Sequence, residues 1–373
     1  MKIAIISHTE HYKKNDGTIV GWGPTIKEIN KLLNIASSIV HIAPLHQEEA
    51  PESALSYNSD KIKFIGLKKS GGKGIGKISI LTTAPSNLMK ISRGIKDADF
   101  VQFRAPTGMG IYILPFLKFF NKKKYWVKYA GNWKDAQMPF GNKLQKFWLQ
   151  KCVPIHTKIT VNGQWENEKE NIIPFENPCL SVLDREFGEK LLRQKKLSKK
   201  ITFCFVGALN EHKGVDKILE SLSQIEDKRI EEIHFVGDGN EKEKYIYKAK
   251  QNIYKTVFHG FLPKEKINEI YSKSHFILLP SKSEGFPKVI AEAMNFGCIP
   301  IVSDVSCISQ YIINDINGFL LSSSTSIILE STIIKALNLS PAEYYQWILY
   351  NYNVAEKFTY EYYNRKLETE IFK

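Results

Sequence analysis

Short apolar runs of strand length alternate with longer stretches of helical pattern along the first half of the chain. Alternation of this kind predicts βαβ units and a parallel sheet. The predicted strands are Lys2–Ser7, Ile39–Ala43, Lys61–Gly66, Phe100–Arg104, Tyr125–Tyr129 and Lys158–Val161. The predicted helices are Pro24–Ser37, Thr83–Ser92, Gly108–Phe120 and Lys143–Lys151.

A second α/β series follows the segment Pro174–Pro178, in which two prolines bracket a short extended stretch and predict a hinge. Its predicted strands are Ile201–Val206, Glu232–Val236, Val257–His259, Phe276–Pro280 and Ile299–Ser303, with helices between them such as Gly214–Gln224 and Lys264–Ser272. We therefore expect an α/β protein with two facing Rossmann-like domains, parallel sheets and a cleft between them. Ligands of open parallel sheets bind beyond the carboxyl ends of the strands, so the cleft is the expected site.

The charge is distributed unequally between the two halves. Residues 1–177 carry 26 Lys and Arg against 14 Asp and Glu, whereas residues 178–373 carry 26 against 25. An excess of this size indicates that the N-terminal half meets an anionic partner, such as phospholipid headgroups or a pyrophosphate-linked acceptor. A lysine-rich composition that only aids solubility is the alternative. Nucleic acid is not an expected partner because no recognised binding module accompanies the lysines.

The cysteines and the apolar segments indicate a cytoplasmic protein. The five cysteines are scattered and lack C-x-x-C spacing, which argues against a disulfide framework or a zinc site. The N-terminus has the pattern of a first strand and not of a signal peptide. The apolar stretch Ile111–Phe120 is interrupted by Pro115 and Lys118 and is far shorter than the ~20 residues that a membrane span needs.

Peripheral attachment to the inner face of the cytoplasmic membrane is a separate question. Bulky apolar residues from Leu114 to Phe120 are followed by Lys122, Lys123 and Lys124. This combination suits docking on an anionic leaflet. A core helix that ends in a basic loop gives the same pattern, and the sequence leaves both readings open.

The segment from Pro280 to Met294 carries the most informative pattern. A buried strand ends in a polar turn, and a helix is predicted from about Gly285 to Phe296. The free backbone N–H groups and dipole of such a helix start favour a diphosphate, and Gly285 allows it to approach the backbone closely. Glu284 and Glu292 would lie on one helix face about 12 Å apart. Carboxylates accept hydrogen bonds from sugar hydroxyls, which suits the two ends of a nucleotide-sugar.

This pattern resembles the E-x7-E motif of retaining glycosyltransferases of family 4, which have the GT-B fold. The resemblance extends from about Phe203 to Leu321. The motifs that carry it are Phe205-Val206-Gly207, Lys213-Gly214, Val236-Gly237-Asp238-Gly239, His259-Gly260, Gly297–Asp304 and Asn317-Gly318. It implies domains of residues 1–177 for the acceptor and 178–346 for the donor, and a C-terminal helix, residues 347–373, that crosses back to the first domain.

The resemblance also implies roles for individual residues. Glu284 holds hydroxyls of the donor sugar, Glu292 the ribose, and Lys213 neutralises the leaving diphosphate, so that Glu284 and Lys213 are the catalytic candidates. The remaining donor-binding candidates are Gly207, Gly237, His259, Gly260, Gly285, Phe286, Pro287 and Lys288. Of the residues at the helix start, Pro287 has no N–H to give to a phosphate.

Two departures from the family concern charge and the acceptor side. Relatives place an arginine after the glycine equivalent to Gly207, whereas this chain has Ala208, and Lys288 or Arg104 is our candidate to replace it. The histidine expected after Tyr125–Tyr129 is absent. The acceptor-side candidates are Gly21, Trp22, Gly23, Arg104, Lys128 and Asn132. Trp22 either stacks on a sugar or packs under its loop.

We therefore expect a retaining, metal-independent hexosyltransferase that needs no cofactor. Its donor is a nucleotide-diphosphate sugar, and its acceptor is a saccharide or lipid-linked intermediate of bacterial surface polysaccharide assembly, such as lipopolysaccharide. Asp97-Ala98-Asp99 resembles a D-x-D metal motif, but its place between a helix and a strand is that of an ordinary turn. A dehydrogenase is excluded because Ser7-His8-Thr9-Glu10 replaces the G-x-G-x-x-G turn. The alternative is a catalytically silent relative that acts as a scaffold.

Overall fold

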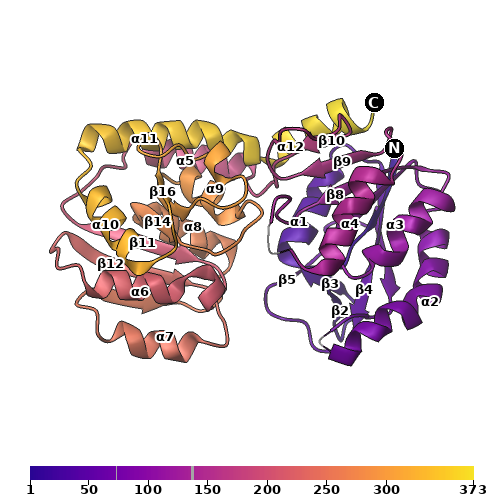
Figure 1. Ribbon diagram of the computed structural model, residues 1–373, viewed down its shortest axis with the longest axis horizontal. Coiled ribbons are helices and arrows are strands. Elements are labelled where there is room, and N and C mark those ends of the chain that lie inside the picture. The colour runs from indigo at the N-terminus through magenta and orange to yellow at the C-terminus, as the bar shows by residue number, and fades with distance from the viewer. Residues whose placement is uncertain (73, 136–137) are drawn as a thin grey trace. The chain divides into compact units, whose positions relative to one another are not determined.

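The computed structural model describes residues 1–72, 74–135 and 138–373. The chain divides into two compact units (Figure 1): unit 1 comprises Met1–Glu176 and Tyr363–Lys373, and unit 2 comprises Asn177–Tyr362. Both units are α/β with parallel sheets, as the alternation of strand and helix patterns predicts. The boundary follows Glu176, and Pro174 of the expected hinge belongs to the last strand of unit 1.

Unit 1 is built on one sheet with the strand order β10-β9-β8-β7-β1-β4-β2-β3-β5, and β6 also pairs with β4. The strands are β1 Lys2–Ile6, β2 His11–Lys13, β3 Ile19–Trp22, β4 Ser38–His46, β5 Ala54–Ser56, β6 Ile62–Leu67, β7 Phe100–Ala105, β8 Lys124–Tyr129, β9 Lys158–Val161 and β10 Ile172–Pro174. The helices are α1 Gly23–Leu32, α2 Ser79–Gly94, α3 Gly110–Phe119 and α4 Phe140–Lys151. The sequence did not predict β2, β3 and β5, of which β3 pairs antiparallel with both of the others.

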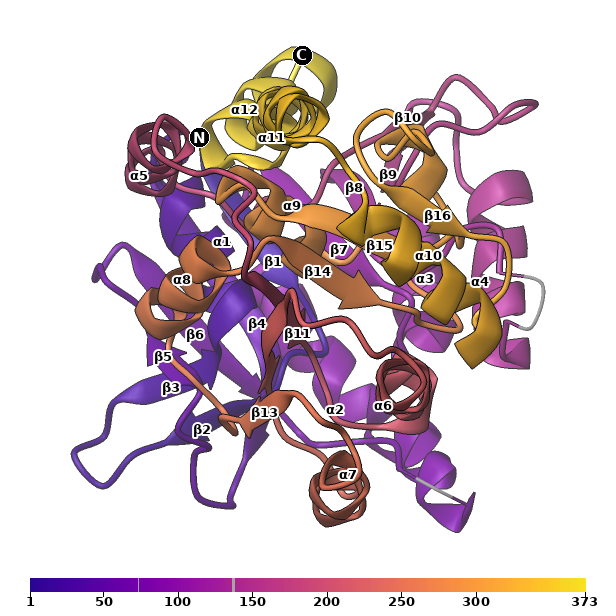
Figure 2. The same ribbon diagram turned by 90° about the vertical axis from the view of Figure 1, so that its left-hand side faces the viewer.

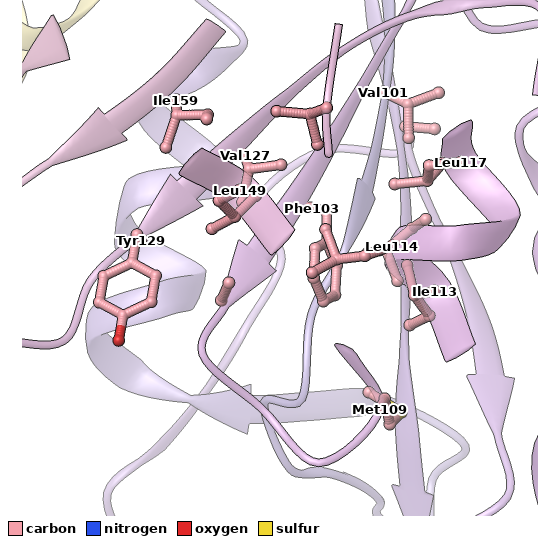
Figure 3. Packing of buried hydrophobic residues seen from close by; sticks show 14 of the residues in the cluster. Val101, Phe103, Met109, Ile113, Leu114, Leu117, Val127, Tyr129, Leu149 and Ile159 are labelled. Carbon is pink, nitrogen blue, oxygen red and sulfur yellow. The ribbon is translucent and has the colours of Figure 1, made fainter. Parts of the chain in front are cut away.

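One face of this sheet is covered by α3 and α4. Figure 3 shows Val101, Phe103 and Val127 of the strands packed against Leu114 and Leu117 of α3 and Leu149 of α4. Leu114 and Leu117 are buried in this core. The first half of the apolar segment before the lysine cluster therefore belongs to a core helix.

The C-terminal segment does not form the single helix predicted for residues 347–373. Helix α11 (Pro341–Ala355) belongs to unit 2, α12 (Tyr360–Lys366) follows after a break, and only Tyr363–Lys373 belongs to unit 1. Between the two helices, Glu356–Phe358 form a short 3₁₀ turn and Thr359 is extended. Phe358 O accepts hydrogen bonds from the backbone of Cys179 and Leu180, which holds this break in place. Tyr363, Leu367 and Ile371 then pack on the α1 side of the sheet.

Unit 2 contains a parallel sheet with the order β13-β12-β11-β14-β15-β16. The strands are β11 Ile201–Val206, β12 Ile230–Val236, β13 Lys255–Phe258, β14 Phe276–Leu279, β15 Ile299–Ser303 and β16 Phe319–Leu321. The other helices are α5 Val182–Leu192, α6 Val215–Ser223, α7 Lys242–Ala249, α8 Lys264–Lys273, α9 Lys288–Asn295 and α10 Ser326–Leu337. In Figure 2, α6 and α10 lie on one side of β11 and β14, and α8 and α9 lie on the other.

The strand order of unit 2 reverses between β11 and β14. The chain moves outward from β11 through β12 to β13, returns to β14, and then continues outward in the opposite direction to β15 and β16. The loops that leave β11 and β14 therefore diverge, and the space beyond their carboxyl ends is where sheets of this type bind ligands. Across the described ranges, no helix has the length and apolar composition needed to cross a membrane.

Candidate functional site

The loops after β11 and β14 are packed together at this reversal point. Gly214 has a φ of +76°, and a Cβ at this position would lie 2.4 Å from the carbonyl oxygen of Pro280 at the end of β14. The backbone N–H of Lys282 donates to His212 O at 2.9 Å, which adds a second tie between the loops. Glycine is therefore required at 214 both for its backbone conformation and for the close approach.

This packing brings Lys213 and Glu284 into an ion pair. Lys213 ends a short 3₁₀ turn, Glu211–Lys213, and its backbone N–H donates to Asn210 Oδ1 at 3.0 Å. The Lys213 side chain is 25% exposed and the Glu284 side chain 10% exposed. The two residues that the sequence nominated for catalysis thus meet at the switch point of the sheet, partly shielded from water.

Glycines line the ends of the neighbouring strands. Gly237 N–H donates to Gly260 O at 2.8 Å, and Gly207 N–H donates to Val236 O at 2.9 Å. A Cβ on Gly237 would lie 1.9 Å from Gly207 O, and the φ of Gly237 is +131°. Gly207, Gly237 and Gly260 are therefore brought together, and their backbones pack too closely for a side chain at position 237.

Helix α9 begins later than predicted. Its first residue is Lys288, and Pro287 precedes it with an extended conformation. Proline fixes its own φ and disfavours a helical conformation in Phe286, which explains why the helix does not start at Gly285. Glu284 therefore lies in the loop and not on the helix, so the predicted spacing of about 12 Å along one helix face does not apply.

The start of α9 has positive character. Its first turn contains no acidic residue, and the ammonium group of Lys288 forms no hydrogen bond or ion pair within the described ranges. Phe286 is buried and stacks on Phe358 at 4.5 Å between ring centroids, so its side chain serves packing. What Gly285, Phe286 and Lys288 can offer a ligand is therefore the loop backbone and one cation.

Glu292 lies on α9 next to a cationic side chain of α8. Tyr271 OH donates to Glu292 Oε2 at 3.4 Å. The ammonium group of Lys264 donates to Asp184 Oδ2 at 2.6 Å. Burial lowers the pKa of Lys264, but the charges of Glu292 and Asp184 outweigh burial and raise it. Glu292 thus lies within electrostatic reach of the Lys264 ammonium group.

The ring of His259 is engaged within the sheet edge. One of its nitrogens shares a hydrogen bond of 2.9 Å with His234. Burial lowers the pKa of His259, although the charge of Glu232 opposes the effect. A contact to a nucleotide base at this position would therefore come from the backbone of His259 and Gly260, as the resemblance implies.

Three buried serine hydroxyls at the same edge were missed by sequence reasoning. Ser281 follows β14, Ser303 ends β15, and Ser306 lies in the next turn with a φ of +55°. Their Oγ atoms are buried and find no hydrogen-bond partner among residues 1–72, 74–135 and 138–373. Buried polar groups are almost always paired, so these hydroxyls are candidates for contacts with a ligand. The sequence held only a weak signal for them, because serines after strands are common.

Arg104 and Lys128, expected on the acceptor side, form a buried cluster in unit 1. They are paired neighbours on β7 and β8, and both donate to Glu28 of α1, at 2.9 Å and 2.7 Å. The ammonium group of Lys128 also lies 4.6 Å from the ring centroid of Tyr363. The cluster unites two cations and one carboxylate at the carboxyl ends of the strands. Arg104 is thereby committed within unit 1 and is a poor substitute for the arginine replaced by Ala208.

The other acceptor-side candidates lie apart from this cluster in the chain. Gly21 and Trp22 end strand β3 and lead directly into α1, which begins at Gly23, so no glycine-rich loop forms here. A Cβ on Gly21 would lie 2.6 Å from the ring of His11, which explains the glycine. Trp22 is 57% exposed, so it does not pack under a loop. Asn132 accepts a hydrogen bond from the backbone of Lys134 at 3.1 Å and shapes its own turn.

No group of three or more His, Cys, Asp or Glu residues able to hold a metal ion occurs within the described ranges. Of the D-x-D sequence, Asp99 accepts a hydrogen bond from the backbone of Lys2 at 2.7 Å and so joins the start of β7 to β1. None of the five cysteines forms a disulfide within the part of the chain that the structure describes, and four of them are buried.

Known proteins resemble this chain in sequence and in fold. An uncharacterized glycosyltransferase of Haemophilus influenzae is 30% identical over 52% of this chain and 54% of its own length. Lipopolysaccharide 1,6-galactosyltransferase of Escherichia coli is 35% identical over 32% of this chain and 34% of its own length. The chain thus spans about half the length, or less, of the curated relatives it matches.

The fold has a close structural counterpart in HepE of Anabaena, solved in complex with UDP and glucose. The TM-score is 0.70 at 14% identity, and the match covers 100% of this chain and 99% of HepE. The structural neighbours are GT-B glycosyltransferases, and the chain has their fold. Residues 188–354, which include Lys213, Glu284 and Glu292, match the model of the family Glycosyl transferases group 1.

Proposed function

We propose that the protein transfers a hexose from a nucleotide-diphosphate sugar to an acceptor hydroxyl, with retention of configuration at the anomeric carbon. The observation that carries this proposal is the ion pair of Lys213 and Glu284 at the switch point of the unit 2 sheet. This position is where open α/β sheets bind ligands, and it lies in the part of the chain that matches the family Glycosyl transferases group 1.

The diphosphate of the donor binds at the start of α9. A lysine in the first turn of a helix is electrostatically unfavourable, because the helix dipole is already positive there. An anion placed between Lys288, Lys213 and the N–H groups of the loop relieves this repulsion. Lys288 then supplies the charge that Ala208 lacks, and the orphaned hydroxyl of Ser281 or Ser303 donates to the same ligand.

The sugar and the ribose are bound by the two glutamates. Lys213 turns toward the diphosphate when the donor binds, which leaves the Glu284 carboxylate available to accept hydrogen bonds from sugar hydroxyls. Glu292, which lies within electrostatic reach of Lys264, accepts a hydrogen bond from the ribose.

In the transfer, the bond between the anomeric carbon and the diphosphate oxygen breaks as the acceptor oxygen bonds to the same face of that carbon. The acceptor proton passes to the departing phosphate oxygen. Lys213 stabilises the negative charge that develops on the leaving group, which is the main electrostatic task of the step. We propose that neither a metal ion nor a cofactor takes part.

Comparison with relatives suggests where to look for the substrates. HepE was solved with UDP and glucose, and the E. coli relative is a lipopolysaccharide galactosyltransferase. We propose a UDP-hexose as the first donor to test, and a saccharide or lipid-linked intermediate of surface polysaccharide assembly as the acceptor class.

The test is thermal stabilisation by a panel of UDP-, GDP-, ADP- and dTDP-sugars, with Glu292→Gln as the site variant. Glu265→Gln is the matched control, because Glu265 is an exposed glutamate on the neighbouring helix α8. We expect one nucleotide to raise the melting temperature of the wild type and the control, with a much smaller effect on Glu292→Gln. Slow hydrolysis of that donor without acceptor identifies a catalyst. Stabilisation by none of the nucleotides refutes the proposal and favours the scaffold alternative.

A further inference from the structure

Unit 1 exposes a group of large apolar side chains on α3 and α4. The group, here called the aromatic face, consists of Phe119, Phe120, Phe140, Leu144 and Phe147. Phe120 is 77% exposed and Phe140 is 81% exposed. Isolated exposed apolar residues are common on protein surfaces, but a contiguous group of them marks an interaction site.

The five side chains are carried by two helices that pack against each other. Phe140, Leu144 and Phe147 follow each other at intervals of four and three residues, so they lie on one side of α4. The buried residues Gln145 and Leu149 are on its other side. The two helices lie side by side (Figure 1), and the ring of Phe119 at the end of α3 lies 6.4 Å from that of Trp148 on α4.

Exposed lysines lie on or next to the same helices in the sequence, and acidic residues are nearly absent from this part of the sequence. Residues 100–165 contain eleven Lys and Arg residues and a single acidic residue, Asp135. Lys122, Lys123 and Lys124 follow the aromatic face at the end of α3, and Lys143 and Lys151 lie on α4. All five are exposed. Residues 100–165 thus have a net charge of +10 (eleven basic residues less one acidic residue), although Arg104 and Lys128 of this set are buried beside Glu28.

The apolar side chains and the positive charge of this region together favour one kind of binding partner over another. A second copy of the chain would bring the lysines of one copy against those of the other, which is unfavourable. An anionic lipid leaflet matches both the positive charge and the apolar side chains. Its headgroups attract the lysines, and its interfacial region takes up aromatic and aliphatic side chains.

We propose that the aromatic face docks unit 1 on an anionic membrane leaflet, with the phenylalanines inserted at the headgroup level and the lysines on lipid phosphates. The membrane contact is therefore made by α4 and the last residues of α3, not by the buried residues Leu114 and Leu117. This membrane docking is a property beyond the proposed transfer reaction. It does not depend on that reaction, because none of the residues assigned to the donor takes part in it.

The experiment is co-sedimentation of the full chain with vesicles of phosphatidylcholine, with and without phosphatidylglycerol. The first variant is Phe140→Ser with Phe147→Ser, and its control is Ile327→Ser, an equally exposed apolar residue on α10 of unit 2. We expect the wild type and the control to bind the anionic vesicles, and the paired variant to bind at least tenfold more weakly.

The second variant separates charge from insertion. Lys122→Glu with Lys123→Glu should lower binding to the anionic vesicles by about tenfold or more, since each lysine near the surface contributes about 1 kcal/mol. Lys199→Glu with Lys228→Glu, two exposed lysines of unit 2, should leave binding unchanged. Each variant should keep the melting temperature of the wild type, because all the altered side chains are exposed.

Three results would overturn the proposal. One is a wild type that does not bind anionic vesicles, and another is a paired phenylalanine variant that binds them as tightly as the control. The third is a wild type that binds a single-stranded oligonucleotide through these residues and ignores lipid. Nucleotide-sugar stabilisation is measured on the same samples, so a failure of membrane docking is distinguishable from a failure of the proposed transferase activity.

Discussion

The contact between Gly214 and the end of β14 holds Lys213 beside Glu284, and Gly214→Ala tests it. An alanine would keep an unfavourable left-handed conformation at about 1–2 kcal/mol. Its Cβ would also lie 2.4 Å from Pro280 O, so one of the two loops must move by about 1 Å. Overpacking of this kind costs about 1–3 kcal/mol more. We therefore expect the free energy of unfolding to fall by about 2–5 kcal/mol in total.

Gly71→Ala is the matched control, because Gly71 has a φ of +99° and no atom lies within 4 Å of its added Cβ. This variant should show only the backbone cost of about 1–2 kcal/mol. Urea denaturation gives both values, and titration with the nucleotide-sugar that stabilises the wild type gives the donor affinity. We expect Gly214→Ala alone to lose at least tenfold in donor affinity. If it matches Gly71→Ala in both measurements, the close approach at Pro280 does not organise the site.

Three further predictions concern single residues. Lys195 is buried and donates to Tyr271 O and Phe296 O at 2.9 Å and 2.6 Å, so Lys195→Met should lower the free energy of unfolding by about 2–4 kcal/mol in urea denaturation. Burial lowers the pKa of His11 to about 4 from 6.5. Since the unfolded chain binds this proton at a higher pH than the folded protein does, protonation of His11 should lower the free energy of unfolding by up to about 3 kcal/mol as the pH falls from 6.5 to 4. Histidine NMR titration would show which residue is responsible. Ser303→Ala should change stability by less than about 0.5 kcal/mol but weaken donor binding about fivefold, and unchanged donor affinity would exclude Ser303 from the site.

The sequence predicts the parallel core of both units because those strands are buried on both faces and appear as continuous apolar runs. Strands β7 and β8 differ from their predicted bounds by a single residue each. The short strands β2 and β5 have three residues each, too few for an alternating pattern, and they exist through pairing with β3 and β4. Local sequence cannot reveal elements that form only through contacts with distant residues.

On the acceptor side, too, contacts between residues distant in the sequence decide what a side chain does. Arg104 is a candidate because it ends a predicted strand at the expected ligand-binding edge, and Lys128 because the family's histidine near this position is absent. Their partner, Glu28, lies on a helix far away in the sequence, and only the fold shows that all three meet. A basic residue at a strand end can serve a ligand or neutralise a buried carboxylate, and the type of residue does not distinguish the two.

The relative position of the two glutamates of the E-x7-E motif depends on the fold and not only on their spacing in the sequence. Spacing on a helix would have placed both carboxylates on one face, but Pro287 delays the helix until Lys288, and Glu284 remains in the loop. Its position depends instead on Lys213 and on the close packing of Gly214 against Pro280. The separation of the two carboxylates is thus set by contacts between two loops and not by helical rise. An alanine at 214 should therefore move Glu284 and leave Glu292 in place, which is why the loss of donor affinity, and not of stability alone, is the decisive readout.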